Sequence, residues 1–485
     1  MSQEICIVPF FGQGHLLPCF QLCNHLTSIN FNVTLLISSN LTTSVPSSLL
    51  QNPLFQLTII PSSPMSLMSP PSPEHHHDDL AKGLQNILSN YHRPSRPVCA
   101  IVDVMMNWSN DVFKKFDVPT VAFFTSGACS AAMEVAIWKA HPLDMKPDEI
   151  RFLPGLPEDM AVTYSDLKRR HHDHHPPPPP RGLGPRKMGP PKLGEQPSWL
   201  DEIRETIGLM INTCDDLERP FIDYIANHVG KPVWGVGPLL PEQYWKSFGS
   251  VIHDRDFRSN RLSSVTEEEV VQWLDSKQRG SVLYVSFGSE VGPTMEEYTE
   301  LAQALELCEQ SFIWVVQPGS GRPGPPHMGL RGKPGSSKPE TEEGYFPDGL
   351  DSRVGNRGLI IRGWAPQLLI LSHTSTGGFL SHCGWNSTVE AIGGGIPLLA
   401  WPIRGDQHYD AKLVVGHLRV GYMVSDDLSK KVTKDDIVEG IQRLMSDEEM
   451  KKNAEVVSAK FRNGFPRSSV AALDAFKDCI NQRSV

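Results

Sequence analysis

Short apolar runs alternate with longer segments of helical periodicity along most of this 485-residue chain. The runs are rich in β-branched and aromatic residues and end at Gly, Pro or polar residues, which is typical of buried strands. We predict strands at residues 5–11, 31–37, 99–102, 120–124, 209–212, 281–287, 311–316, 359–361, 377–380 and 396–400, and helices at 18–26, 294–307, 386–392, 407–415, 434–445 and 448–461. Strands that alternate with helices indicate an α/β fold with parallel, doubly wound sheets.

The chain is longer than one hydrophobic core normally supports, so we expect two domains of roughly 200 residues or more. A Gly- and Pro-rich stretch at residues 234–241 has the composition of a linker. We therefore place a first Rossmann-like domain at residues 1–237 and a second from residue 238 onward.

Composition narrows the class of protein. Hydrophobic residues make up 39% and charged residues 21%, with a formal net charge of −10, which argues against nucleic acid and anionic membrane surfaces as partners. No apolar run is long enough to span a membrane, and no basic stretch precedes the apolar residues 5–11, so we expect neither a membrane span nor a targeting segment. Nine scattered cysteines without a C-x-x-C pair indicate reduced thiols and a cytoplasmic protein.

A run of 44 residues, 364–407, combines a flat aromatic residue with polar groups suited to phosphate and sugar. It opens with Trp-Ala-Pro-Gln, carries His-Cys-Gly-Trp-Asn-Ser at residues 382–387 and closes on Asp-Gln. The polar residues 381–385 lie between a predicted strand and a predicted helix, where the helix N-terminus suits a diphosphate. A Cys-His nucleophile at Cys383 lacks the third orienting residue, so we interpret Cys383 as part of a tight turn.

This run resembles the signature of plant family 1 UDP-dependent glycosyltransferases. The resemblance implies the GT-B architecture of two facing Rossmann-like domains, with the last residues, 461–485, forming a helix that packs back on the first domain. It implies donor-binding roles as follows: His382, Asn386 and Ser387 on the diphosphate of a UDP-sugar, with Trp385 in the same turn; Trp364 and Gln367 on uracil; Glu390 on the ribose; Asp406 and Gln407 on the sugar hydroxyls.

A Gly-x-Gly-His turn at residues 12–15 follows the first predicted strand. It lacks the third Gly and the downstream acid of a dinucleotide site, which disfavours NAD. In the family that the chain resembles, such a turn carries the catalytic base, and a neutral imidazole can accept a proton from an acceptor hydroxyl. The resemblance thus implies a catalytic pair of His15 and Asp103, the residue that closes the strand 99–102. It also places Thr125 against the donor sugar and Ser289 in a phosphate-side loop.

Three other features offer alternative chemistry. The His clusters at 171–175 and 75–77 suggest a metal, but adjacent His residues in a Pro-rich or polar segment rarely converge on one ion. Residues 254–256 contain an Asp-x-Asp, the metal-holding pattern of a different glycosyltransferase architecture, yet no apolar strand precedes it. We therefore expect no metal cofactor. The Pro-rich segment 169–193 and the Gly-, Pro- and Lys-rich segment 317–343 do not have the pattern of a folded core.

Together these features predict a cytoplasmic, monomeric, inverting glycosyltransferase that moves glucose from UDP-glucose to a small phenolic acceptor such as a flavonoid. In the family, Gln at the position of Gln407 accompanies glucose donors. A C-glycosyltransferase on the same acceptors, a UDP-sugar epimerase and a catalytically silent UDP-sugar-binding protein remain as alternatives.

Overall fold

The computed structural model describes residues 3–61, 73–91, 96–168, 194–246, 262–321 and 344–483. These form two compact units, one made of Met1–Ala132, Gln196–Glu242 and Phe465–Val485, the other of Met133–Glu195 and Gln243–Gly464. This division differs from a single boundary near residue 237, because residues 133–195 group with the second unit. The C-terminal segment groups with the first unit.

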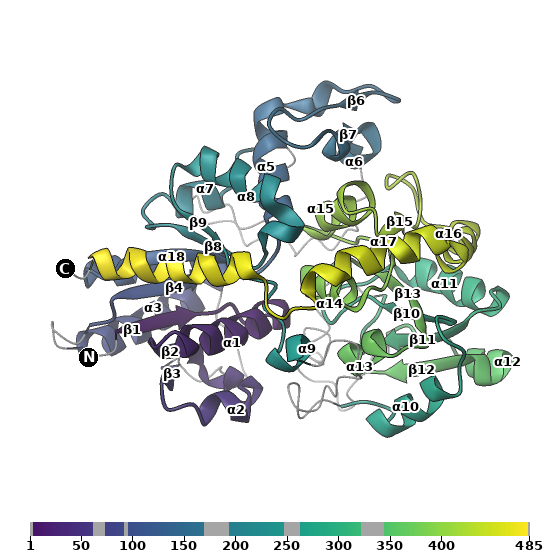
Figure 1. Ribbon diagram of the computed structural model, residues 1–485, viewed down its shortest axis with the longest axis horizontal. Coiled ribbons are helices and arrows are strands. Elements are labelled where there is room, and N and C mark those ends of the chain that lie inside the picture. The colour runs from purple at the N-terminus through teal and green to yellow at the C-terminus, as the bar shows by residue number, and fades with distance from the viewer. Residues whose placement is uncertain are drawn as a thin grey trace, which may run out of the picture. The chain divides into compact units, whose positions relative to one another are not determined.

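The first unit is built on a parallel sheet of seven strands in the order β3-β2-β1-β4-β5-β8-β9 (Figure 1). The strands are β1 Glu4–Val8, β2 Asn32–Ser38, β3 Phe55–Ile60, β4 Cys99–Asp103, β5 Thr120–Phe124, β8 Leu209–Ile211 and β9 Val233–Gly235. Its helices are α1 Gln13–Ser28, α2 Ser47–Leu50, α3 Pro73–Ser89, α4 Trp108–Lys115, α5 Ala128–Ala140 (which runs on into the second unit), α7 Trp199–Glu202, α8 Asp215–Val229 and α18 Arg467–Arg483. The strand order reverses between β1 and β4, and ligands of open α/β sheets collect at such a point.

Both faces of this sheet are covered by helices, which explains why its central strands β1, β4 and β5 are mostly apolar and buried. Ile5 and Ile7 of β1 belong to a core that includes residues of α1 and α18, whereas Cys6 and Val8 belong to a second core with α3 and α4. Phe476 of α18, the yellow helix of this unit in Figure 1, is fully buried. Alternate residues of one strand therefore serve opposite faces.

Part of the predicted linker is a strand. Trp234 and Gly235 belong to β9, which pairs in parallel with β8. The Trp234 ring is 5% exposed and lies edge-on to Phe476 at 5.4 Å between ring centroids. Gly and Pro nearby indicated a linker, but burial of this aromatic side chain against α18 extends the sheet by one edge strand.

Helix α1 begins earlier than the predicted start at Pro18. The N–H groups of His15 and Leu16 both donate to the carbonyl of Gly12 at 3.0 Å. Pro18 therefore lies inside the helix, where it lacks the N–H that would bond four residues back. As a consequence His15 is on the first turn of a helix and not in the preceding loop.

The second unit is built on a parallel sheet of six strands in the order β12-β11-β10-β13-β14-β15. The strands are β10 Val282–Ser286, β11 Ser311–Val316, β12 Gly358–Arg362, β13 Thr376–Ser381, β14 Leu398–Ala400 and β15 Gly421–Met423. The helices are α6 Tyr164–Lys168, α9 Glu242–Lys246, α10 Glu267–Asp275, α11 Met295–Leu307, α12 Leu350–Val354, α13 Gln367–Ser372, α14 Trp385–Gly394, α15 Gln407–Lys412, α16 Lys434–Ser446 and α17 Glu448–Ser458. A short antiparallel pair, β6 Ile150–Arg151 with β7 Val162–Thr163, also belongs to this unit.

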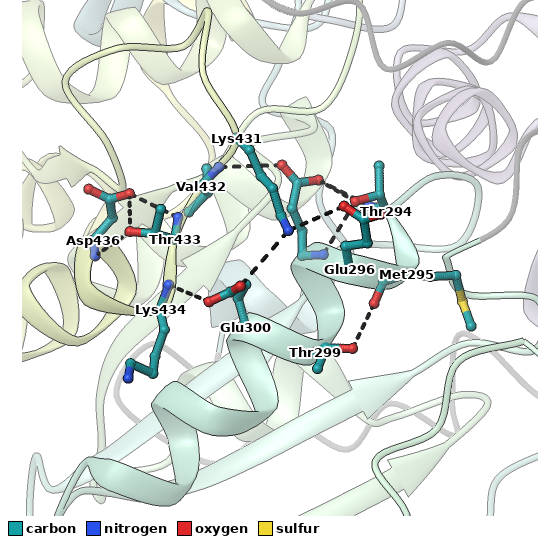
Figure 2. A network of polar contacts seen from close by, with 11 residues as sticks. Thr294, Met295, Glu296, Thr299, Glu300, Lys431, Val432, Thr433, Lys434 and Asp436 are labelled. Carbon is teal, nitrogen blue, oxygen red and sulfur yellow. Dashed lines mark hydrogen bonds and ion pairs between the residues drawn. The ribbon is translucent and has the colours of Figure 1, made fainter.

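A polar network aligns α16 with α11 on one face of this sheet (Figure 2). Each helix starts with a capping box, in which Thr294 or Thr433 exchanges hydrogen bonds with the residue three positions later. The backbone N–H of Lys434 donates to Glu300 at 3.0 Å, and the Lys431 ammonium lies 3.2 Å from Glu296. These contacts fix the starts of two helices whose apolar sides share one core with β10 and β11.

Several sequence features lie outside the described residues. They are the His cluster at 171–175 with the Pro-rich segment 169–193, the Asp-x-Asp at 254–256, most of the segment 317–343, and the side chains of the His cluster at 75–77. Within the described part of the chain, no helix is both long and apolar enough to cross a membrane.

Candidate functional site

Three residues at or beyond the ends of three adjacent strands converge in the first unit. Nδ1 of His15, on α1 after β1, lies 2.8 Å from Oδ2 of Asp103, the last residue of β4. Oγ1 of Thr125, directly after β5, lies 3.0 Å from the same nitrogen. Because β1, β4 and β5 are neighbours in a parallel sheet, their carboxyl ends meet at one edge. The structure therefore brings together the three residues that the sequence proposed for this unit.

The environment of this pair differs for its two members. The Asp103 side chain is fully buried, and its Oδ1 accepts a hydrogen bond from the Met105 N–H at 2.9 Å. The His15 side chain is 26% exposed. A buried carboxylate next to Nδ1 favours the tautomer with the proton on that nitrogen, which leaves the lone pair on Nε2.

Large apolar side chains stand beside the pair. Phe10 lies edge-on to His15 at 5.0 Å between ring centroids and packs on Phe11 at 3.9 Å. Phe11 and Met105 are each 56% exposed. Since each follows the end of β1 or β4 by two or three positions, the carboxyl edge of this sheet carries accessible apolar surface close to the imidazole.

Two buried polar residues support this arrangement, and neither was singled out from the sequence. Asn212, at the end of β8, donates to the Thr125 carbonyl at 3.0 Å and accepts from the Leu239 N–H at 2.7 Å. Glu218, on α8, accepts from the N–H groups of Ala128 and Cys129 at 2.7 Å each, at the start of α5. The loop between β5 and α5, which contains Thr125, is thus tied at both ends.

Glu218 has an unusual protonation equilibrium and backbone. Burial raises the pKa of its carboxyl group to about 7, although the two backbone N–H groups act in the opposite direction. Its backbone angles, φ −139° and ψ 26°, interrupt the helix. A sequence signal does exist, namely an acid two residues before Pro220 within an amphipathic helix, but its partners 89 and 90 positions away cannot be read from the sequence.

The second unit gathers most of the predicted donor residues at the carboxyl edge of its sheet. Ser289 follows β10, Trp364 follows β12, His382 follows β13 and Gln407 follows β14. Trp364 is half-buried, as are Asn386 and Asp406. The Trp385 side chain is only 3% exposed, so its indole belongs to the interior while its backbone begins α14.

Gln367 is hydrogen-bonded to two other predicted donor residues. Nε2 of Gln367 donates to Oε2 of Glu390 at 2.6 Å and to Oγ of Ser387 at 3.0 Å, while its Oε1 accepts from the Tyr284 hydroxyl at 3.1 Å. Glu390 and Ser387 are 1% and 8% exposed. Tyr244 of α9 adds a hydrogen bond to the Glu390 carbonyl at 2.9 Å. A carboxylate, an amide and a hydroxyl are therefore preorganised on adjoining turns of α13 and α14.

His382 is enclosed by backbone. It is 9% exposed, and a Cβ atom added to Gly288 or Gly384 would lie 2.7 or 2.6 Å from its Nε2. Gly288 also has a φ of +73°, so both space and conformation require glycine there. Burial, followed by the positive charge of Arg404, lowers the pKa of His382 to about 4. The imidazole is neutral near pH 7 and offers hydrogen bonds without a full charge.

Gln407 is oriented by its own loop. Its Oε1 accepts from the N–H groups of Ile403 and Arg404, both at 3.0 Å. A glutamine side chain has one carbonyl acceptor and one amide donor that could meet a sugar hydroxyl. In the structure the carbonyl is already engaged by backbone, which leaves the Nε2 donor for a ligand.

No group of three or more His, Cys, Asp or Glu residues that could hold a metal ion occurs among the residues that the structure describes. All nine cysteines are free thiols, and Cys383, next to His382, is buried with its pKa raised by desolvation. A raised thiol pKa disfavours the thiolate, so Cys383 is not an activated nucleophile.

This chain resembles known proteins over most of its length. Residues 259–464 match the family model described as UDP-glucoronosyl and UDP-glucosyl transferase. The chain is 30% identical over 485 residues to the anthocyanin 3'-O-beta-glucosyltransferase of Gentiana triflora, covering 92% of this chain and 90% of the relative. It is 32% identical over 349 residues to UDP-glucosyl transferase 73M2 of Saponaria officinalis, covering 70% of this chain and 63% of that relative.

Solved structures show the same fold. Medicago truncatula UGT71G1 complexed with UDP-glucose matches with a TM-score of 0.73 at 23% identity, covering 99% of this chain and 98% of that one. The GT-B fold expected from the sequence is therefore confirmed. Family model, relatives and fold agree, and this chain belongs to the UDP-glycosyltransferase family.

Proposed function

We propose that this enzyme transfers glucose from UDP-glucose to a hydroxyl group of a small phenolic metabolite, with inversion at the anomeric carbon. The observation that carries the proposal is the His15–Asp103 pair, a partly exposed imidazole held at 2.8 Å by a buried carboxylate. With Nδ1 engaged by Asp103, Nε2 can act as a general base at neutral pH.

The chemical step follows from this assignment. Nε2 of His15 takes the proton of the acceptor hydroxyl while the acceptor oxygen attacks the anomeric carbon of the donor. The bond between that carbon and the diphosphate oxygen breaks, and its electron pair leaves with UDP. Attack from the face opposite UDP converts an α-linked donor into a β-glycoside. Asp103 stabilises the imidazolium that forms, because its charge is buried and close to Nδ1.

The donor side requires no metal in this proposal. The N-terminus of α14 presents backbone N–H groups and the positive end of a helix dipole beside Asn386 and Ser387. His382 adds a neutral hydrogen bond. Trp364 would stack on uracil, and Gln367 would bind the polar edge of the base. Glu390 would accept hydrogen bonds from the ribose hydroxyls, once the ligand has displaced the hydrogen bond between Gln367 and Glu390.

A flat, apolar acceptor suits the first unit. The exposed side chains of Phe11 and Met105 provide apolar surface beside His15. The Gentiana triflora relative is named for an anthocyanin, a phenolic acceptor, and this class is adopted here for the chain. A phenol is also more acidic than an aliphatic alcohol, which eases proton transfer to an imidazole.

We place the enzyme in the cytoplasm as a monomer. The free state of all nine cysteines, eight of them buried, supports a reducing compartment.

A coupled assay of UDP release, with and without a panel of plant phenolics, tests the function. We expect acceptor-dependent release of UDP and a product that loses the intact hexose on mass fragmentation, as an O-glycoside does. Fragments from within the sugar ring would instead identify a C-glycoside. Conversion of the UDP-sugar without acceptor would indicate an epimerase, and binding without turnover would indicate a silent binding protein.

A further inference from the structure

We propose that Arg404 is a ligand for the diphosphate of the donor, and that Glu290 holds the guanidinium beside the site until the donor binds. This inference rests on the proposed donor site at the carboxyl edge of the second sheet. Arg404 is not among the residues that the family signature assigned to the donor.

The position of the ion pair follows from strand order. β13 lies between β10 and β14, with Ser381 at the end of β13 aligned with Ser286 of β10 and Ala400 of β14. Glu290 and Arg404 each lie four residues beyond the ends of these two outer strands. Nη2 of Arg404 is 3.1 Å from Oε2 of Glu290. The pair therefore joins the two loops across the end of β13, where His382 is located.

His382 carries, at this place, a buried polar atom without a protein partner in the described part of the chain. The side chain is more than nine-tenths buried, and its Nδ1 has no hydrogen-bond partner among the residues that the structure describes. A buried polar atom without a protein partner is unfavourable, which points to a hydrogen bond with a ligand at this position. The guanidinium is close enough to His382 for its charge to help lower the pKa of the imidazole.

The site also needs a positive charge that His382 cannot supply. A diphosphate is a multiply charged anion, whereas His382 is neutral near pH 7 because its pKa is lowered to about 4. Arginine remains charged at all relevant pH values, and its planar fork fits phosphate oxygens in a bidentate manner. Arg404 can therefore provide charge that the imidazole does not.

The ion pair between Arg404 and Glu290 is weak enough for the guanidinium to exchange the carboxylate for a diphosphate. The side chains of Arg404 and Glu290 are 47% and 38% exposed, and such solvent-exposed pairs are weak and easily separated. The backbone N–H of Arg404 is fixed by Gln407 at 3.0 Å, so the side chain starts from a constant position. When the donor binds, the guanidinium of Arg404 can exchange the Glu290 carboxylate for a diphosphate, which it can contact through two hydrogen bonds. The diphosphate carries more negative charge than one carboxylate, and the loop does not need to move.

Titration calorimetry with UDP and with uridine tests the proposal. We expect Arg404→Met to weaken UDP binding about tenfold, as for loss of a charge-assisted hydrogen bond, and to leave uridine binding unchanged. Glu290→Gln removes the competing carboxylate, so UDP should bind at least as tightly as to the wild type. The loss caused by Arg404→Met should shrink as salt rises, because added ions screen the contact.

A matched control is available in the same unit. Arg353 pairs with Glu306 at 2.9 Å with side chains 49% and 38% exposed, but Arg353 lies on α12, which precedes the amino end of β12. Arg353→Met removes an equivalent ion pair at a helix that precedes β12, whereas the proposed site lies beyond the carboxyl ends of the strands. It should leave UDP affinity at the wild-type value.

The outcomes separate this inference from the proposed function. Wild-type protein that does not bind UDP would overturn the donor site itself. Normal UDP binding by Arg404→Met, or an equal loss of UDP and uridine, would overturn only the role of Arg404, since equal loss means that the loop has been disturbed. A loss confined to the sugar part of UDP-sugars, with UDP itself unaffected, would place the guanidinium on the sugar and also overturn the assignment.

Discussion

Nδ1 of His15 and Oδ2 of Asp103 lie 2.8 Å apart although 88 positions separate the two residues in the sequence. The carboxylate is buried and its other oxygen is held by the Met105 N–H, so its position is defined independently of the imidazole. The end of β4 positions the Asp103 carboxylate, and the carboxylate orients the His15 imidazole. This orientation determines which nitrogen of His15 faces a substrate. Four of the five predictions below concern side chains at the carboxyl edges of the first and second sheets, and one concerns Glu218, which supports the loop that contains Thr125.

Replacing His15 by Ala removes the proposed base. We expect kcat to fall by about 10²-fold or more, in line with general-base contributions, because the imidazole proposed to take the acceptor proton is removed. UDP affinity should remain at the wild-type value, since the residues proposed to bind UDP itself lie in the other unit. Steady-state kinetics with one phenolic acceptor and calorimetry with UDP measure both. Normal turnover on an alcohol acceptor would exclude His15 as the base.

Replacing Asp103 by Asn tests positioning. The amide keeps the shape of the carboxyl group but presents no charge to stabilise the imidazolium, so kcat should fall roughly 10-fold to 100-fold. KM for the donor should change little. The pH profile of kcat/KM distinguishes this role from simple loss of structure, because the apparent pKa of the base should decrease without the carboxylate. An unchanged profile would show that Asp103 does not act on His15.

Glu218→Gln tests the support behind Thr125. The folded-state pKa is about 7 and the reference value is 4.5, so the unfolded state loses its proton first as pH rises. The carboxyl group therefore contributes stability that is fully present below pH 4.5 and is lost as pH rises through 7, by roughly 3 kcal/mol in total.

Glutamine cannot titrate, so the stability of wild type relative to Glu218→Gln should be greater at pH 5 than at pH 7.5. The difference between the two proteins cancels the opposite contribution of His382, whose lowered pKa makes stability rise between about pH 4 and 6.5. The amide also directs a donor at the N–H of Ala128 or Cys129, which should destabilise the variant by about 1–3 kcal/mol. Urea unfolding at both pH values provides the measurement, and parallel stability curves would contradict the prediction.

Trp364→Ala removes the proposed platform for uracil. The indole is half-buried after β12, and loss of one stacked aromatic contact should weaken UDP binding about 10-fold, given stacking energies of roughly 1–3 kcal/mol per base. The catalytic pair is untouched, so kcat at saturating donor should be nearly normal. Trp273→Ala, at an indole on α10 that contacts Lys277, serves as a control. A folded Trp364→Ala protein with wild-type UDP affinity would place uracil elsewhere.

Gln407 should select glucose over galactose. The two sugars differ in the direction of one hydroxyl, and the structure leaves the amide Nε2 as a donor because Oε1 is bonded to Ile403 and Arg404. Gln407→Glu keeps the acceptor that holds the loop and loses the donor, so the preference should fall by about 10-fold or more while thermal stability is retained. Gln407→Ala should lose both the preference for glucose and part of the thermal stability. Competition between equimolar UDP-glucose and UDP-galactose measures the preference, and a wild-type enzyme that favours galactose would remove Gln407 from this role.

Much of the fold could be predicted from the sequence, because parallel strands that are buried on both faces consist of short apolar runs. Strands β5 and β11 begin and end where the pattern predicted them. The prediction of a linker was wrong at Trp234, which lies in a Gly-rich segment but belongs to an edge strand. Pro18 likewise suggested a helix start but lies within the second turn of α1, where it lacks the N–H for the usual hydrogen bond four residues back.

The sequence by itself determined the identity of the family and the candidate donor residues, because the residues of the 44-residue run are close along the chain and their spacing is visible. The tertiary structure alone decided which distant residues meet. Strand order β1-β4-β5 brings His15, Asp103 and Thr125 together, and order β10-β13-β14 places Arg404 and Glu290 across His382. No local pattern encodes that order, which results from packing helices on both faces of each sheet, and so the contacts that depend on it became visible only in the folded chain.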